Sequence, residues 1–143
     1  MSAELDPALH ERITVLSEAG DTLAEDENYA GAIARYREAL ALVPAPVTHW
    51  EAATWLYAAI GDAAFLAGAF AEAREALQTA MQCPDAIGNP FIHLRLGQAQ
   101  YELDEHDRAA DELIRAYMGA GAGIFDDEDP KYLDFLATRA RLD

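Results

Sequence analysis

Residues 20–44 of the chain read GDTLAEDENYAGAIARYREALALVP. Gly20 is followed, at offsets of nine, twelve, sixteen and nineteen, by Tyr29, Ala32, Tyr36 and Ala39, and a proline closes the stretch. The two alanines lie seven residues apart, so they share one face of a helix. The stretch therefore predicts two antiparallel helices joined by a short turn, with small residues where the backbones cross.

The same four offsets recur twice further along the chain. Gly61 is followed by Phe70, Ala73, Leu77 and Ala80, and Gly97 by His106, Ala109, Leu113 and Ala116. Alanine stands at plus twelve and plus nineteen in every copy. This agreement indicates three copies of one helix pair, in which small residues let the helices approach and the residue at plus nine is expected to wedge between them.

These residues resemble the tetratricopeptide repeat (TPR), a helix–turn–helix unit of about 34 residues, and the resemblance covers residues 8–121. It implies an all-α, TPR-like α-solenoid that forms a single domain over residues 1–143. Three helix–turn–helix repeats are expected at about 13–46, 54–87 and 90–121. A C-terminal helix at 129–141 would cap the last repeat, as solenoids require.

The capping residues and the breaks in the pattern predict seven helices. They are expected at 7–26, 29–42, 48–67, 70–82, 90–103, 106–120 and 129–141. We expect Thr48 to cap the third helix and Asp129 the seventh, because side-chain oxygens accept free backbone N–H groups there. Pro90 and Pro130 suit the first turns of the fifth and seventh helices.

The charge of the chain narrows the range of partners. Of 143 residues, 26 are acidic and 10 are basic, so the formal net charge is −16. This sign disfavours nucleic acid and acidic membrane surfaces as partners and favours a basic protein. Residues 52–70 are mostly alanine and glycine with Asp62 as their only charge, and they are interpreted as a buried helix of a soluble protein. The lone Cys83 and the acidic start of the chain, which lacks a signal-peptide pattern, indicate a cytoplasmic protein.

The inventory of chemistry-bearing residues argues against an enzyme, a cofactor or a bound metal. The sequence has no Gly-rich phosphate loop with a lysine, and no His-Glu-x-x-His or paired-cysteine metal motif. Its histidines, His10, His49, His93 and His106, are dispersed. Cys83 with His49 or His93 is a conceivable nucleophile–base pair, but a half-buried structural thiol is the favoured interpretation.

The TPR resemblance implies that partners bind along a concave face formed by the first helix of each repeat. The residues expected there are Ser17, Asp21, Ala24, Trp55, Ala58, Asp62, Phe65, Phe91, Leu94, Arg95, Gln98 and Tyr101. Of these, the candidate partner-binding residues are Asp21, Trp55, Asp62, Phe65, Arg95, Gln98 and Tyr101. Burial in the core is the alternative for the aromatic ones. We expect Arg95 to pair internally with Asp62 rather than to contact a partner directly. Asp21 stands where TPR domains that hold acidic chaperone tails carry an asparagine, so no such clamp is expected.

The acidic run at residues 126–129 is the densest charge in the chain. One interpretation is a solvated linker that also caps the last helix, where carboxylates meet the helix dipole favourably. The other is a clamp for arginines or lysines of a partner, rimmed by exposed apolar side chains. The clamp would consist of Asp126, Asp127 and Glu128, flanked by Ile124, Phe125 and Tyr132. A calcium site is a weaker alternative, because no EF-hand spacing accompanies the carboxylates.

Together these features favour a non-enzymatic module that binds a basic protein. A small, strongly acidic protein without a catalytic set is similar to the immunity proteins that neutralise bacterial toxins, which must mask basic surfaces. Residues 128–132 (EDPKY) are also similar to a C-terminal segment of small bacterial TPR proteins. The alternative is a TPR chaperone or adaptor for a secretion substrate or a multiprotein complex. An enzyme subunit or a small-ligand sensor is a third class.

Overall fold

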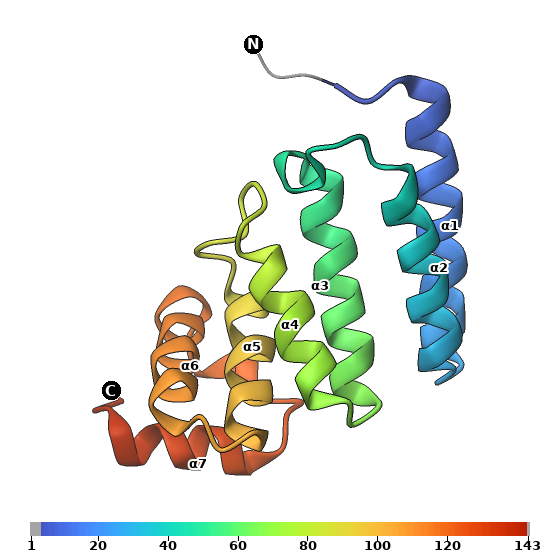
Figure 1. Ribbon diagram of the computed structural model, residues 1–143. Coiled ribbons are helices and arrows are strands. Elements are labelled where there is room, and N and C mark those ends of the chain that lie inside the picture. Colours follow the sequence, from blue (N-terminus) through green and yellow to red (C-terminus); the bar gives the residue numbers. More distant parts are fainter. Residues whose placement is uncertain (1–3, 143) are drawn as a thin grey trace.

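The computed structural model describes residues 4–142, and in that range it contains helices and no strand. The α-helices are α1 (Pro7–Glu25), α2 (Tyr29–Leu42), α3 (Glu51–Leu66), α4 (Phe70–Ala80), α5 (Pro90–Glu102), α6 (His106–Ala120) and α7 (Pro130–Arg139). Two 3-10 turns, η1 (Val47–His49) and η2 (Ala122–Phe125), lie in the connections. Helices α1 to α6 stand side by side in chain order, and α7 lies crosswise below α5 and α6 (Figure 1). The expected all-α, TPR-like solenoid is confirmed.

Each of the three helix pairs is built on one close contact between a glycine and a large side chain of the following helix. The pairs are Gly20 with Tyr36, Gly61 with Leu77, and Gly97 with Leu113. A Cβ atom on any of these glycines would lie only 2.4 to 2.8 Å from the opposing side chain. A side chain there would force the helices apart, so glycine is required by the close approach.

The residue at plus sixteen therefore contacts the glycine, whereas the residue at plus nine packs between the two helices near the turn. Phe70, at plus nine, packs against Phe65 near the turn, with ring centroids 5.6 Å apart. His106, at plus nine in the third copy, stacks on Tyr101 at 5.3 Å. The plus-nine position begins the second helix, so its side chain meets the end of the first helix.

Side-chain caps fix the beginnings of four helices. Asp6, Asn28, Asn89 and Asp129 accept a backbone N–H from the first turns of α1, α2, α5 and α7, respectively. The predicted cap at Asp129 is thus confirmed, with Lys131 N donating to its carboxylate at 3.0 Å. Pro90 and Pro130 occupy the first turns of α5 and α7 as expected.

Helix α3 begins later than the pattern predicted. Thr48 lies inside the 3-10 turn η1, and the helix starts at Glu51 after Trp50, whose backbone is extended. Trp50 makes no side-chain cap; its indole Nε1 donates to the carbonyl of Pro44 at 2.9 Å. The prolines at 44 and 46 fix an extended path, and this path delays the helix by three residues beyond Thr48.

The core follows the alanines and the large residues that face them. Ala32, Ala73 and Ala109, the three plus-twelve positions, have no exposed surface. One apolar cluster joins α1, α2 and α3, and another joins α5 and α6 to η2 and α7, with Leu113 and Leu136 fully buried. None of the helices within residues 4–142 has the length and apolar character needed to cross a bilayer.

Candidate functional site

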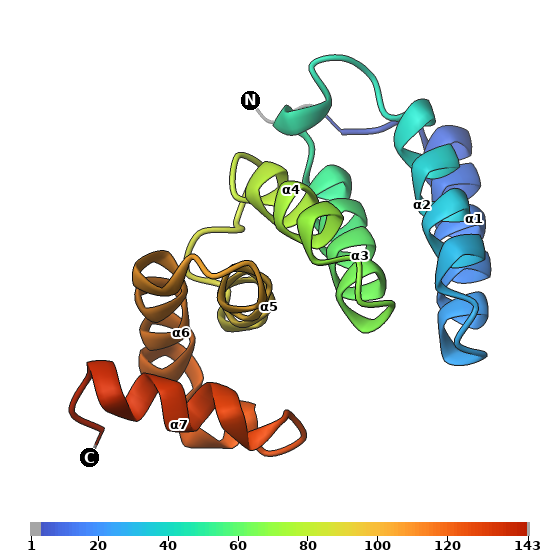
Figure 2. The same ribbon diagram turned by 60° about the horizontal axis from the view of Figure 1, so that its bottom comes forward.

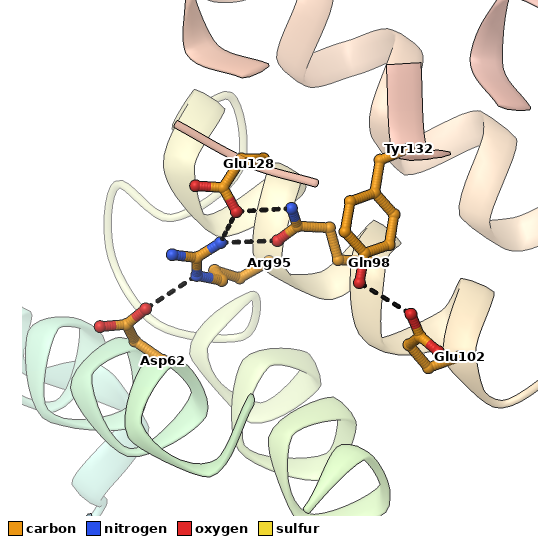
Figure 3. Close-up of polar contacts among 6 residues, drawn as sticks. All are labelled: Asp62, Arg95, Gln98, Glu102, Glu128 and Tyr132. Atoms are coloured by element: carbon orange, nitrogen blue, oxygen red, sulfur yellow. Dashed lines mark hydrogen bonds and ion pairs between the residues drawn. The ribbon is translucent and has the colours of Figure 1, made fainter. Parts of the chain in front are cut away.

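The α5 side of the concave face carries a polar network centred on Arg95 (Figure 3). Its Nε donates to Asp62 of α3 at 2.7 Å, and its Nη1 donates to the Gln98 side-chain oxygen at 2.7 Å. The same Nη1 also meets a carboxylate oxygen of Glu128, which comes from the loop before α7. Gln98 Nε2 donates to that oxygen at 2.8 Å. One cation thus ties α3, α5 and the C-terminal segment together.

The network is shielded from water. The Arg95 side chain is 10% exposed and that of Glu128 is 14% exposed, while Gln98 is fully buried. Burial by itself lowers the pKa of Arg95, but the hydrogen bonds and charges of Asp62 and Glu128 outweigh it and hold that pKa above its usual value. The guanidinium therefore keeps its charge, and that charge is balanced inside the protein.

A second group of contacts holds α7 against the same face. The hydroxyl of Tyr132 donates to Glu102 of α5 at 2.8 Å, and Lys131 Nζ lies 2.5 Å from the same carboxylate. The Tyr132 ring meets Tyr101 edge-on, with centroids 5.5 Å apart, and Phe65 at 6.3 Å. Burial first, and the Glu102 carboxylate second, raise the pKa of Tyr132 above its usual value. Figure 2 shows α7 lying across the ends of α5 and α6.

These contacts determine the burial and pairing of several predicted site residues. The expected internal pair of Arg95 with Asp62 is confirmed. Gln98 is buried, and Phe65 and Tyr101 are half-buried against Tyr132. The C-terminal segment of the chain itself covers this part of the concave face.

The acidic run divides into two kinds of residue. Asp126 and Asp127 are exposed, whereas Glu128 is engaged by Arg95 and Gln98. Glu128 is therefore part of an internal network, contrary to the expectation that it belongs to an exposed clamp. The apolar flank was also misjudged, because Phe125 is 5% exposed and Tyr132 is 4% exposed. Both side chains pack into the cluster between α5, α6 and α7 instead of forming exposed anchors.

The α1 side of the concave face is open. Trp55 of α3 is 47% exposed and lines two adjoining hollows, of about 450 Å³ and 180 Å³. The larger is lined by Glu4, Leu5, His10, Trp50, Glu51, Ala52 and Trp55. The smaller is lined by His10, Ile13, Thr14, Ser17, Glu18, Ala52, Trp55 and Leu56. Because His10, Ala52 and Trp55 line both, the two hollows form one groove between α1 and α3, called the Trp55 groove below.

Two further predicted residues lie beyond this groove on the same helices. Asp21 of α1 is exposed, and its carboxylate accepts a hydrogen bond of 2.7 Å from the hydroxyl of Tyr36. Burial and the Asp21 carboxylate raise the pKa of Tyr36. Asp62, the equivalent residue of α3, is one-third exposed and faces Arg95. Asp21 therefore presents an unneutralised carboxylate, whereas the charge of Asp62 is shared with Arg95.

The conceivable cysteine–histidine pair is not formed. Cys83 is buried, its Sγ lies 3.5 Å from the carbonyl of Thr79, and burial raises the pKa of its thiol. Both ring nitrogens of His93 are engaged elsewhere: Nε2 accepts from the backbone N–H of Gly88, and Nδ1 lies 2.6 Å from Glu112. Cys83 is thus a structural thiol, and it is buried where a half-buried one was expected. Residues 4–142 also bring no three acidic, histidine or cysteine side chains together in a way that could hold a metal ion.

The sequence-based selection missed His10, Glu18 and Glu51 as groove residues. A helical period would have identified them. His10 lies seven residues before Ser17 on α1, and Glu51 lies four residues before Trp55 on α3, so each shares a face with a residue already selected. Glu102, the partner of Tyr132, had no comparable signal, because the contact depends on how α7 packs.

Comparisons with known proteins establish the class of fold. The TPR domain of Arabidopsis OM64 superimposes with a TM-score of 0.72 at 20% identity, over 92% of this chain and 99% of that one. The first TPR domain of Spaghetti (RPAP3), solved with the HSP90 peptide SRMEEVD, gives 0.68 at 17% identity, over 90% of each chain. The Sgt2 TPR domain from Aspergillus fumigatus gives 0.66 at 19%, over 93% and 77%. No protein-family model and no curated protein matches the sequence. The chain therefore has the fold of a TPR domain.

Proposed function

We propose that this protein is a non-enzymatic interaction module that binds a basic protein through its concave face. The observation that carries the proposal is the Trp55 groove, where a half-exposed tryptophan lies among carboxylates on an open face of a TPR fold. Tryptophan is enriched among the residues that dominate binding energy at protein interfaces. The net charge of −16 attracts a partner of the opposite sign.

The proposed binding residues fall into two groups. Asp21 and Trp55 lie on the open part of the face, and Asp62 is one-third exposed where it pairs with Arg95; all three contact the partner directly. The other five residues hold the C-terminal segment against the covered part of the face and so support the binding surface indirectly. They are Phe65, Arg95, Gln98, Tyr101 and Glu128. Asp126 and Asp127 form a second acidic patch on the exposed loop before α7.

The partner of the Spaghetti domain is an acidic peptide, and the surface described above is itself acidic, so it would repel such a peptide. On the α5 side, Arg95 already has two carboxylate partners, Asp62 and Glu128. On the α1 side, the two hollows are lined by the carboxylates of Glu4, Glu18 and Glu51 together with His10. A basic partner is therefore favoured over an acidic chaperone tail.

The specific role we propose is that of an immunity protein that neutralises a basic bacterial toxin. Such a protein masks a positively charged substrate-binding surface, and strong acidity is what that task needs. The alternative role is that of a TPR chaperone or adaptor for a secretion substrate or a multiprotein complex.

Capture from a lysate of the source organism, followed by titration with each purified partner, tests the proposal. An immunity protein binds a single basic protein with a Kd of about 1 nM or tighter and abolishes its toxicity. A chaperone binds several segments with a Kd of about 1 μM or weaker, and no toxicity is involved. Partners with acidic binding surfaces would contradict the proposed function in both forms.

A further inference from the structure

The two parts of the concave face differ in how far their polar groups and aromatic rings are already engaged within the protein. On the α5 side, Arg95 has its charge balanced by Asp62 and Glu128, and Gln98 has partners for both its oxygen and its nitrogen. The ring of Tyr132 covers Tyr101 and Phe65. An incoming segment would have to displace Glu128 and Tyr132 before reaching this part. The Trp55 groove, in contrast, is open.

The Trp55 groove has a defined chemistry. Its centre is largely aromatic, because Trp55, His10 and Ala52 are shared by both hollows and Trp50 lines the larger one. Carboxylates line both hollows, Glu4 and Glu51 the larger one and Glu18 the smaller one. Neither hollow is lined by a lysine or an arginine in the described part of the chain. A ligand that fits must present a positive charge together with a flat, weakly hydrated surface.

Arginine meets both requirements. Its guanidinium is planar, stacks on aromatic faces and donates two parallel hydrogen bonds to a carboxylate. A cation over a tryptophan face is attracted by the ring quadrupole, and tryptophan is the best of the aromatic side chains for this contact. The protein already uses the same contact internally, since the guanidinium of Arg95 lies 5.0 Å from the ring centroid of Phe65 and 5.3 Å from that of Phe91.

We propose that the Trp55 groove binds an extended, arginine-bearing segment of the partner protein, with an arginine stacked on Trp55 between Glu18 and Glu51. This proposal rests on the proposed function, since it specifies the chemistry of the same concave face. Of the remaining lining residues of the larger hollow, Leu5, His10 and Ala52, the apolar Leu5 and Ala52 accept an apolar neighbour of that arginine. Both the carboxylates and the tryptophan contact the same arginine, so removing either should weaken binding.

Three peptides of one design serve as probes, because they need no identified partner. They are acetylated and amidated Gly-Leu-Arg-Gly-Arg-Leu-Gly and its versions with lysine or glutamate in place of both arginines. Titration of the full chain by calorimetry, at about 20 mM salt where screening is weak, compares their affinities. We expect the arginine peptide to bind about threefold or more tightly than the lysine peptide, because lysine lacks the planar stack. We expect no binding of the glutamate peptide.

Two variants locate the site. Glu18→Gln with Glu51→Gln removes the flanking charges, and Trp55→Ala removes the stacking surface, which is half-exposed in the folded protein. Each should weaken binding of the arginine peptide by about fivefold or more. The matched control is Glu25→Gln with Asp134→Asn, two exposed carboxylates outside the groove, which changes the net charge equally. It should change the affinity by less than about twofold.

The possible outcomes distinguish a failure of the proposed groove site from a failure of the proposed function. Equal losses in the groove variant and the charge-matched control would show attraction by net charge alone and overturn the groove site, while leaving a basic partner in place. Unchanged affinity in Trp55→Ala, with circular dichroism showing a folded chain, would also overturn the groove site. Binding of the glutamate peptide as tightly as the arginine peptide would overturn both the groove site and the proposed basic partner.

Discussion

Arg95 of α5 donates through Nε to the carboxylate of Asp62 on α3 at 2.7 Å, across the boundary between the second and third helix pairs. The same guanidinium reaches Glu128, which precedes α7. The side chain is 10% exposed, so its two ion pairs lie in a region of low dielectric. The pairing therefore couples the stacking of the helix pairs to the docking of the C-terminal segment.

Replacing Arg95 with methionine should destabilise the protein by about 3 kcal/mol, because Glu128 and Asp62 would lose their shared counter-charge. The free energy of unfolding from urea denaturation measures this. Arg35→Met is the matched control, since Arg35 pairs with Glu38 on the surface at 43% and 48% exposure. The control should cost no more than about 1 kcal/mol. Equal losses in the two variants would mean that the network contributes no more than a surface pair.

The acidic residues before α7 should differ in how much they contribute to stability. Glu128→Gln removes one charge facing Arg95 and should cost about 1–2 kcal/mol, because the remaining hydrogen bond is no longer charge-assisted. Asp126→Asn with Asp127→Asn changes exposed side chains only and should leave the stability within about 0.5 kcal/mol. Thermal melts of both variants check this. Equal destabilisation would contradict the internal role of Glu128.

The exposed pair then tests the clamp. If Asp126 and Asp127 meet arginines of the partner, their double replacement by asparagine should weaken partner affinity by about tenfold, while the melting temperature stays unchanged. Calorimetric titration with the purified partner gives the affinity. Unchanged affinity would identify the exposed part of the run as a solvated linker and leave binding to the concave face.

Much of the fold was predictable from the sequence because it depends on local spacing. The offsets from Gly20, Gly61 and Gly97 predicted the helix pairs, and the observed bounds of α2 and α6 agree with the expected ones. Spacing could not show which large residue meets each glycine. That contact depends on the crossing of the helices, which places Tyr36 rather than Tyr29 over Gly20.

The candidate site was less predictable for a related reason. Arg95 lies in a mostly apolar helix, so its need for a counter-charge indicated Asp62, which the repeat register places on the neighbouring first helix. Glu128 lies in a loop without helical periodicity, 33 residues from Arg95 along the chain. Its position depends on how η2 and α7 pack, through buried Phe125 and Tyr132, and no local pattern encodes that packing.

The close packing of the plus-twelve alanines gives a prediction on stability. Ala73→Leu inserts three carbon atoms at a position with no exposed surface and should cost about 1–3 kcal/mol through overpacking. Ala71→Leu, on the exposed side of the same helix, is the matched control and should change the stability by less than about 0.5 kcal/mol. Ala32→Leu and Ala109→Leu should behave like Ala73→Leu. Three unchanged melting temperatures would contradict the repeat packing.

Tyr36 and Tyr132 should make the free energy of unfolding fall in alkaline solution. Burial, and then the carboxylates of Asp21 and Glu102, raise both pKa values in the folded protein. Above about pH 10 the unfolded chain loses these protons while the folded chain keeps them, so unfolding is favoured as the pH rises. Urea midpoints from pH 8 to 11 should therefore decline. In Tyr36→Phe with Tyr132→Phe the decline should be shallower, and an identical slope would contradict this origin.

The last prediction concerns the rate at which a basic partner associates. A net charge of −16 creates an attractive field that acts before contact, so it accelerates encounter more than it slows dissociation. Raising the salt from about 20 mM to about 500 mM shortens the distance over which charges act to a few ångströms. The association rate constant should fall by about tenfold or more, while the dissociation rate constant changes by less than about threefold.

Stopped-flow mixing that follows the fluorescence of Trp55 and Trp50 measures both rate constants. Glu25→Gln with Asp134→Asn lowers the net charge by two without touching the Trp55 groove, so it should slow association slightly and leave dissociation unchanged. Glu18→Gln with Glu51→Gln removes the same charge from the groove itself and should also accelerate dissociation, because the bound segment loses direct contacts. Association rates that do not depend on salt would contradict electrostatic steering, and with it the reason for expecting a basic partner.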